Sequence, residues 1–467
     1  MVSISVEDNN SKPGHYCGLA GIYAESPLNI PQNLFYSLFS LQHRGQESAG
    51  VSYRKNGNIV TYRDLGMVPA VLSRYLHMER LSNIGIGHVR YSTKGGNRIE
   101  NVQPLHAVCN KGQIAIAHNG TISNASALKK ALFNKGAIIQ STSDTELILH
   151  MLSMNDETDF KKALFSTLRL LEGAFSLLII RDESLIAARD PNGFRPLYMG
   201  KKEGMTTFAS ETCALDILQA NDVREVEPGE IIIIDKNGMR SERFAEPVRI
   251  SQCVFELIYF ARPDSSIFGK SVHLMRKKMG AALAVNEKIK GDIVMAVPDS
   301  GNSAALGYAE ESGLPLEYGL SRNHYAGRSF IMPTKEQREL MVRMKLNPVK
   351  EVVKDKKIIL VDDSLVRGTT SRLIVKMLRE AGAKEIHLRL SSPEIKCPCY
   401  FGIDIPTREE LISNRMTPEE IADHIGADSV FFLPVESLMG CLGNPDDFCY
   451  ACFTGIYPIE VDETGEI

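Results

Sequence analysis

Cys17 is the residue with the clearest capacity for chemistry, because sixteen largely polar residues precede it and an apolar, strand-like segment, 18–23, follows it. If residues 1–16 are removed, the new N-terminus carries a thiol nucleophile. Its own α-amino group has a pKa near neutrality and can take the proton. The alternative interpretation is that Cys17 is an ordinary small buried residue at the start of a first strand. Other segments must decide between these interpretations.

Three later segments each supply a group that amide hydrolysis by a thiolate requires. The guanidinium of Arg90 can clamp an α-carboxylate, and the carboxylate of Asp144 can hold an α-ammonium. Asn119 and Gly120 offer two N–H donors for a tetrahedral oxyanion. Each also has an ordinary interpretation: a surface ion pair for Arg90, a hairpin turn for Asn119-Gly120, and a helix N-cap for Asp144. Their combination and order favour amide hydrolysis.

A second constellation follows the apolar run 358–361, which is typical of a buried parallel strand. The run ends at Asp362 and Asp363, whose carboxylates suit ribose hydroxyls or a hydrated divalent ion, although an acidic pair at a strand end is often only a solvated turn. A loop of glycine and hydroxyl residues then leads into an amphipathic segment, as at phosphate sites on helix N-termini. The candidate phosphate-binding residues are Arg367, Gly368, Thr369, Thr370 and Ser371.

The chain has nine cysteines, and an odd number without a secretory signal argues against a disulfide framework. Cys449 and Cys452 form a C-x-x-C pair, which by itself fits a zinc site, a redox pair or no function at all. The remaining cysteines are Cys17, Cys109, Cys213, Cys253, Cys397, Cys399 and Cys441.

The elements that must position these residues fall into two domains. The first, 17–250, alternates short strands with helices; the strands are expected at 113–117, 175–180 and 230–234, and the helices at 128–133 and 144–152. The second, 251–467, alternates strand and helix in the manner of a parallel sheet, at 292–297, 301–312, 358–361, 372–383 and 385–390. The ligand loops then fall at carboxyl ends of strands, where open α/β sheets bind ligands. The join at 249–254 has no linker composition, so the domains are expected to pack together.

The first half of the chain, including Leu-Gln-His-Arg-Gly-Gln-Glu-Ser-Ala-Gly at 41–50, resembles the class II glutamine amidotransferases. The resemblance implies a four-layer αββα sandwich with Cys17 as the catalytic nucleophile. It also implies that Arg90 and Asp144 hold glutamine and that Asn119 and Gly120 form the oxyanion hole. Thr93 is a weaker substrate contact.

The segment 362–371 resembles the signature of type I phosphoribosyltransferases, which have a parallel sheet and bind 5-phosphoribosyl 1-pyrophosphate with magnesium. Joined to the first domain, it makes the chain similar from Cys17 onward to the amidophosphoribosyltransferase family. That family transfers ammonia from glutamine to phosphoribosyl pyrophosphate in the first committed step of purine synthesis. The resemblance places Ser300 with Asp362 and Asp363 at the magnesium ion and Lys345 at the diphosphate. It makes 321–333 a loop that closes over the substrate.

The surroundings of Cys253 and Cys399 resemble the branch of this family that carries a [4Fe-4S] cluster. The implied ligands are Cys253, Cys399, Cys449 and Cys452, and the implied role is to staple the C-terminal segment to the core. Cys397 would share a face with Cys399 on an extended segment, so periodicity alone does not separate them. The resemblance also implies that 1–16 is a propeptide. It further implies a homotetramer inhibited by purine nucleotides such as AMP, ADP and GMP.

Two other functions compete with that of the amidophosphoribosyltransferase family. Other class II amidotransferases, which make glucosamine phosphate or asparagine, would lack the 362–371 signature, and a transcriptional sensor of phosphoribosyl pyrophosphate would carry a DNA-binding appendage. The chain of 467 residues, 43% hydrophobic, is long enough for two cores. Its net charge of −4 gives no attraction to nucleic acid. No apolar run could span a bilayer, and 1–16 lack the apolar core of an export signal, so the protein is expected in the cytoplasm.

Overall fold

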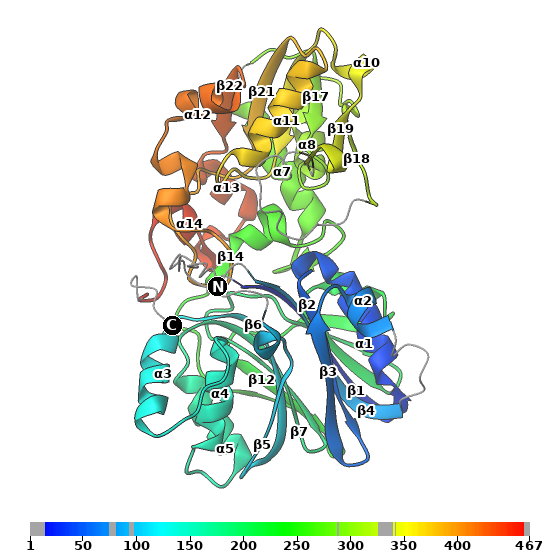
Figure 1. The fold of residues 1–467 in the computed structure, drawn as a ribbon, viewed down its shortest axis with the longest axis vertical. Coiled ribbons are helices and arrows are strands. Elements are labelled where there is room, and N and C mark those ends of the chain that lie inside the picture. Colours follow the sequence, from blue (N-terminus) through cyan, green and yellow to red (C-terminus); the bar gives the residue numbers. More distant parts are fainter. Residues whose placement is uncertain are drawn as a thin grey trace, which may run out of the picture.

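The computed structural model describes residues 15–73, 81–92, 98–286, 289–325, 340 and 342–461, with the backbone alone for 15–16 and 91–92. Thr93 and residues 326–333 of the predicted substrate loop lie outside the described residues. Figure 1 shows two halves, with the N-terminal half below and most of the C-terminal half above. Within the described ranges, no helix is both long enough and apolar enough to cross a membrane.

The N-terminal half contains two antiparallel sheets that pack face to face. One has the order β11-β9-β10-β1-β4-β2-β3 and the other β13-β12-β8-β7-β6-β5. The strands of the first sheet are β1 (His15–Asn29), β2 (Ser48–Lys55), β3 (Asn58–Leu65), β4 (Leu81–Ser92), β9 (Tyr198–Lys202), β10 (Met205–Ala209) and β11 (Asn221–Glu225). Those of the second are β5 (Leu105–Cys109), β6 (Gly112–Ile122), β7 (Gly173–Arg181), β8 (Ser184–Arg189), β12 (Glu230–Asp235) and β13 (Gly238–Arg243).

Helices cover the outer faces of both sheets, which confirms the αββα sandwich (Figure 1). The inner faces share one apolar core, in which Leu19 of β1 and Ala117 of β6 are both buried. Strand β7 is buried along almost its whole length, as expected for an apolar run covered on both sides. The helices are α1 (Ile30–Ser40), α2 (Val68–Leu72), α3 (Ala125–Asn134), α4 (Asp144–Ser153), α5 (Phe160–Arg169) and α6 (Thr212–Asp216).

The C-terminal half is built on a four-stranded parallel sheet of order β17-β20-β21-β22, which confirms the predicted parallel sheet. These strands are β17 (Ile293–Ala296), β20 (Lys357–Asp362), β21 (Glu385–Leu390) and β22 (Ser429–Phe432). The helices include α7 (Val272–Val285), α8 (Asn302–Ser312), α10 (Lys350–Val353), α11 (Thr369–Glu380), α12 (Pro418–Ile425), α13 (Val435–Leu442) and α14 (Ala451–Thr454). Two-stranded pairs complete it: β14 (Gln252–Cys253) with β23 (Phe448–Cys449), β15 (Ser266–Ile267) with β16 (Lys270–Ser271), and β18 (Leu320–Arg322) with β19 (Leu346–Pro348).

Helix α11 begins at Thr369, three residues before the predicted start at 372. Gly368 precedes it with φ of +74°, a left-handed conformation that glycine adopts without strain. The hydroxyl residues of the loop therefore form the first turn of the helix, where backbone N–H groups have no partner within the helix.

The two halves pack directly against each other, as expected from the absence of a linker. The backbone N–H groups of Ser251 and Cys253 donate to the carbonyl oxygens of Asn192 and Phe194, at 2.8 and 3.1 Å. The ring of Phe194 stacks on Phe401 from the C-terminal half, with centroids 4.2 Å apart. The domain boundary near residue 250 is thus a continuous packed junction.

Candidate active sites

Cys17 lies in β1, a central strand of its sheet, directly opposite Arg90 of β4. Its side chain is 2% exposed, and its carbonyl oxygen accepts a hydrogen bond from Nε of Arg44 at 2.9 Å. The strand continues upstream of Cys17, because Tyr16 pairs with Tyr91 in the same register. The backbone nitrogen of Cys17 is therefore part of a peptide bond in this structure.

Burial raises the pKa of the Cys17 thiol to about 12, while Arg90 lowers it and Asp144 raises it. A thiol in this environment is protonated at neutral pH and is a poor nucleophile. The side chain therefore needs a base close by, and a free α-amino group on Cys17 itself would supply one.

Asn119 lies in the middle of β6, in the sheet that faces β1, so its interpretation as part of a hairpin turn is wrong. Its side chain is fully buried, and neither its oxygen nor its nitrogen has a hydrogen-bond partner among the described residues. Gly120 follows with φ of +142°, and a Cβ atom there would lie 2.1 Å from the carbonyl oxygen of Ala174. Buried unpaired amides are costly, so the pair fits a site that receives an oxyanion.

Arg90 and Asp144 lie close to Cys17, as predicted for a glutamine site. Arg90 is 4% exposed, so its interpretation as a surface ion pair is wrong. Burial lowers the pKa of its guanidinium, and the charges of Cys17, Glu47 and Asp144 act in the opposite direction. Asp144 is the first residue of α4 rather than the N-cap, which is Ser143, and its Oδ2 accepts a hydrogen bond from the amide of Ile122 at 2.9 Å.

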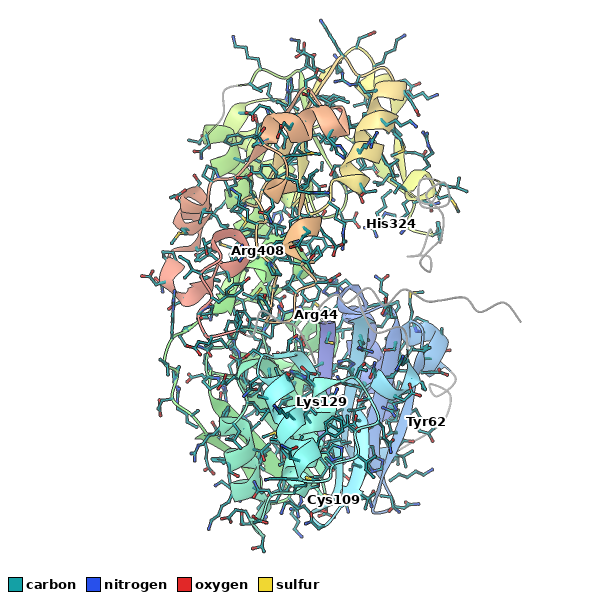
Figure 2. The ribbon with its side chains drawn as sticks, turned by 60° about the vertical axis from the view of Figure 1, so that its left-hand side comes forward. Arg44, Tyr62, Cys109, Lys129, His324 and Arg408 are labelled. Atoms are coloured by element: carbon teal, nitrogen blue, oxygen red, sulfur yellow. The ribbon has the colours of Figure 1, made fainter. Side chains whose placement is uncertain are left out.

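The predictions missed a buried ionic network at the junction of the two halves. Arg44 donates from Nη1 to Oε1 of Glu211 at 2.5 Å and from Nη2 to Oε1 of Glu256 at 2.8 Å, and all three side chains are fully buried. Figure 2 shows Arg44 where the two halves meet. Arg44 stands within the family-like segment 41–50, and Glu256 stands in the family-like segment that follows Cys253, but neither residue was predicted to have a role of its own. The network connects the Cys17 carbonyl to the C-terminal half.

The predicted magnesium residues converge at the end of β20. Asp362 and Asp363 are 9% and 5% exposed, and the Ser300 hydroxyl donates to Oδ1 of Asp362 at 3.3 Å. Burial raises the pKa of Asp362 well above its ordinary value, and the charge of Asp363 raises it further. Two crowded carboxylates and a hydroxyl are oxygen donors of the kind that suit a divalent cation, which would relieve their repulsion.

The predicted phosphate-binding residues are divided in the structure. Gly368, Thr369, Thr370 and Ser371 surround the start of α11, beside the acidic pair. Arg367 instead points to Glu410, with Nη2 and Oε2 2.6 Å apart, so it does not contribute to the phosphate cradle in this conformation. Lys345 lies beside the start of the predicted substrate loop, where its carbonyl accepts a hydrogen bond from the amide of Asn323 at 2.8 Å.

The four predicted cluster cysteines lie near one another at the junction. Cys253 of β14 and Cys449 of β23 are opposite each other in register. Burial raises the pKa of Cys452 well above its ordinary value, and the charges of Cys449, Cys399 and Cys253 raise it further. The amide of Phe401 donates to Sγ of Cys399 at 3.4 Å. Four soft donors, of which Cys452 is buried and the other three are half-buried, together with an N–H···S bond suit an iron–sulfur cluster.

The other cysteines have different surroundings. Cys397 packs against Gly455, because a Cβ atom added to that glycine would lie 3.1 Å from Sγ of Cys397. Cys441 lies near Lys278. Cys213 lies beside Glu211 of the ionic network. Cys109 lies at the far end of the N-terminal half (Figure 2). Within the described ranges, no three His, Cys, Asp or Glu side chains could hold one metal ion. A cluster does not require that arrangement, because each thiolate binds a different iron atom.

Comparisons with known proteins agree with both halves of the fold. A glutamine amidotransferase domain matches residues 88–217, and a phosphoribosyl transferase domain matches residues 273–391. The amidophosphoribosyltransferase of Bacillus subtilis is 47% identical, over 95% of this chain and 94% of its own length. That of Methanocaldococcus jannaschii is 46% identical, over 96% of this chain and 98% of its own length.

Two solved structures cover 96% of this chain and 98% of their own chains. The glutamine phosphoribosylpyrophosphate amidotransferase of B. subtilis, complexed with ADP and GMP, superposes with a TM-score of 0.89 at 45% identity. A structure described as the allosteric regulatory enzyme of purine biosynthesis superposes with a TM-score of 0.91 at 46% identity.

Proposed function

Because this chain belongs to the amidophosphoribosyltransferase family, we propose that Cys17 releases ammonia from glutamine and that the site at Asp362 adds it to phosphoribosyl pyrophosphate. The products are glutamate, pyrophosphate and 5-phosphoribosylamine, in the first committed step of purine biosynthesis. The observation that carries the glutaminase assignment is the buried, unpaired amide of Asn119 beside Gly120.

In the glutaminase site, the residues of this chain bind and orient glutamine and stabilise its transition state. Arg90 binds the α-carboxylate and Asp144 the α-ammonium, which places the side-chain amide at Cys17. The thiolate attacks the amide carbon, and Asn119 and the Gly120 amide donate to the oxyanion. The α-amino group of a processed Cys17 takes the thiol proton and returns it to the departing ammonia. Water then hydrolyses the thioester to glutamate.

In the second site, the chain's own groups bind phosphoribosyl pyrophosphate at the carboxyl end of β20. The first turn of α11 holds the 5-phosphate through backbone N–H groups and hydroxyls. Asp362, Asp363 and Ser300 would hold a magnesium ion, which when bound neutralises the charge of the leaving pyrophosphate. Ammonia attacks the anomeric carbon as the bond to pyrophosphate breaks.

Ammonia must reach the second site unprotonated, so the passage between the halves must exclude water. The packed junction supports this proposal, since Gly402 of the C-terminal half is so close to the oxyanion strand that a Cβ atom on it would lie 3.1 Å from Cα of Gly120. Closure of the 321–333 loop would complete the enclosure.

Release of pyrophosphate should require both glutamine and phosphoribosyl pyrophosphate, because the two domains supply consecutive steps. A coupled assay that omits each substrate in turn measures this. Turnover with fructose 6-phosphate or aspartate as acceptor would instead indicate the glucosamine phosphate or asparagine reactions. Binding of phosphoribosyl pyrophosphate without any turnover would favour the sensor function.

We also propose that Cys253, Cys399, Cys449 and Cys452 hold a [4Fe-4S] cluster that staples the C-terminal segment to the core. Their mutual proximity supports this ligand set. Residues 1–16 are proposed to be a propeptide. Because a relative was solved in complex with ADP and GMP, we propose that purine nucleotides inhibit this protein. From the family resemblance, we propose that it assembles as a homotetramer.

Anaerobically purified protein should contain about four iron and four sulfide atoms per chain. Replacing any of the four cysteines with serine should lower both the iron content and the yield of folded protein, measured by metal analysis and circular dichroism. Cys397→Ser is the matched control, because Cys397 neighbours the same segment, and it should leave iron nearly unchanged. Stoichiometric zinc without iron would contradict the cluster.

A further inference from the structure

Arg195 is a buried cation whose donors are largely unused. Its side chain is fully buried, and none of its three guanidinium nitrogens makes a hydrogen bond to a described residue. Its described contacts are an ion pair from Nη2 to Oε1 of Glu256 at 3.2 Å and the ring of Phe260, whose centroid is 5.5 Å from Cζ. Unpaired buried donors of a charged group are costly, so a ligand that accepts them would stabilise this side chain.

The backbone around Arg195 connects two functional regions. The preceding residue, Phe194, accepts a hydrogen bond from the amide of Cys253 at 3.1 Å. The carbonyl oxygen of Arg195 itself accepts from the hydroxyl of Ser176 at 3.3 Å, and Ser176 lies opposite Asn119 in the β6–β7 register. Arg195 is therefore anchored between the cysteine site and the oxyanion strand.

Arg195 belongs to the buried ionic network that reaches Cys17. Its partner Glu256 follows Cys253 in the chain and also binds Arg44, whose Nε donates to the carbonyl oxygen of Cys17 at 2.9 Å. The Arg195 guanidinium also lowers the pKa of the Cys17 thiol, which burial raises. Glu256 offsets this charge only in part, because both of its carboxylate oxygens also accept hydrogen bonds from Arg44, at 2.8 and 3.0 Å.

We propose that Arg195 is a counter-ion shared by the two sites. Its unused N–H groups donate to the sulfur atoms of the cysteine-bound cluster, and its charge shields the Cys17 thiolate from that cluster. The inference rests on the proposed [4Fe-4S] cluster, whose four thiolates leave it with net negative charge. A positive neighbour disfavours loss of an electron from such a group, and hydrogen bonds to the sulfurs stabilise it. Arg195 thus protects the cluster from oxidation while keeping Cys17 ionisable.

The first test measures how fast the cluster decays when anaerobically purified holoenzyme is exposed to air, where dioxygen accepts the electron. Arg195→Met should accelerate the loss of visible absorbance and iron about tenfold, within the range for loss of an outer-shell partner of a metal site. Arg189→Met is the matched control. This variant also removes a fully buried guanidinium from the same segment of the chain. The N–H groups of Arg189, unlike those of Arg195, already donate to Glu225, Val226 and Gly193. The control should decay at the wild-type rate; equal acceleration in both variants would overturn the proposal.

The second test follows alkylation of Cys17 by iodoacetamide as a function of pH, with the modified peptide quantified by mass spectrometry. Arg195→Met should move the profile to higher pH, because the thiolate loses a favourable charge and faces the cluster unshielded. Arg195→Lys keeps the charge but loses the planar fork. It should show faster cluster decay with a nearly unchanged Cys17 profile, and it supplies the test if the methionine variant does not fold.

The possible outcomes distinguish a failure of the proposed role of Arg195 from a failure of the proposed cluster. Wild-type protein without iron would remove the cluster and the inference together. If wild-type protein holds the cluster, but the cluster decays in Arg195→Met and Arg195→Lys at the wild-type rate, only the role of Arg195 is overturned.

Discussion

Cys17→Ala should lower glutamine-dependent synthesis of 5-phosphoribosylamine by at least about 10⁴-fold, because the variant lacks the thiol nucleophile that attacks the amide carbon. Ammonia-dependent synthesis should survive, since the Asp362 site is built from residues of the other half. N-terminal sequencing of the wild-type enzyme should find Cys17 as the first residue. If the thiol also drives its own release, the variant should keep residues 1–16. The two activities are measured by pyrophosphate release with glutamine or with ammonium chloride.

Asn119→Ala is the matched comparison, because it leaves the nucleophile in place and removes one oxyanion donor. Glutamine-dependent activity should fall by about 10²-fold or more, with ammonia-dependent activity again retained. Arg90→Ala should act on the same half-reaction. Fully active wild-type enzyme that still carries residues 1–16 would rule out the α-amino group as the base, and equal loss with both nitrogen sources would place Cys17 outside a separate glutaminase site.

Asp362→Ala and Asp363→Ala should lower synthesis from glutamine and from ammonia alike. A metal ion at this site contributes several kcal/mol of transition-state stabilisation, so each loss should be at least about 10²-fold. Pyrophosphate release with each nitrogen source, at saturating magnesium, measures the effect. Ammonia-dependent turnover that is unaffected by both substitutions would show that the acceptor binds elsewhere.

Asp362→Asn provides a control that separates chemistry from folding. The carboxyl of Asp362 is buried against Asp363, and that like charge raises its pKa. An asparagine oxygen can still accept from the Asp363 amide and the Ser300 hydroxyl, which are its described donors. The free energy of unfolding without magnesium should therefore not decrease, while activity falls as for alanine. A chemical denaturation curve tests this, and a large loss of stability would assign Asp362 a structural role.

Local sequence was enough to predict the residues whose chemistry depends on a single strand, turn or helix start. The apolar run before Asp362 predicts a buried parallel strand, and the glycine and hydroxyl residues after it predict a phosphate-binding helix start; the structure has both. The start of α11 was placed three residues late, because the left-handed conformation of Gly368 depends on a backbone angle that composition does not reveal.

Where the sequence pattern allowed two local environments for a residue, the tertiary structure showed which one it occupies. Periodicity could not separate Cys397 from Cys399, and the segment 397–400 turns out not to be a regular strand. The family resemblance had named Cys399, and packing in the structure places Cys399 near the other three cysteines and Cys397 against Gly455. Similarly, composition allowed Asn119 to lie in a hairpin turn, whereas pairing with β7 places it within a buried strand.

The sequence by itself determined which chemical groups this protein has and the order in which its two domains follow each other, because motifs and hydrophobic periodicity are local properties of the chain. The tertiary structure decided how those domains communicate. Arg44 and Glu256 are separated by 212 residues, yet they form a fully buried pair at the junction. Such contacts depend on how two cores pack, which no spacing along the chain encodes. The same packing brings Arg195 within electrostatic range of both Cys17 and Cys253.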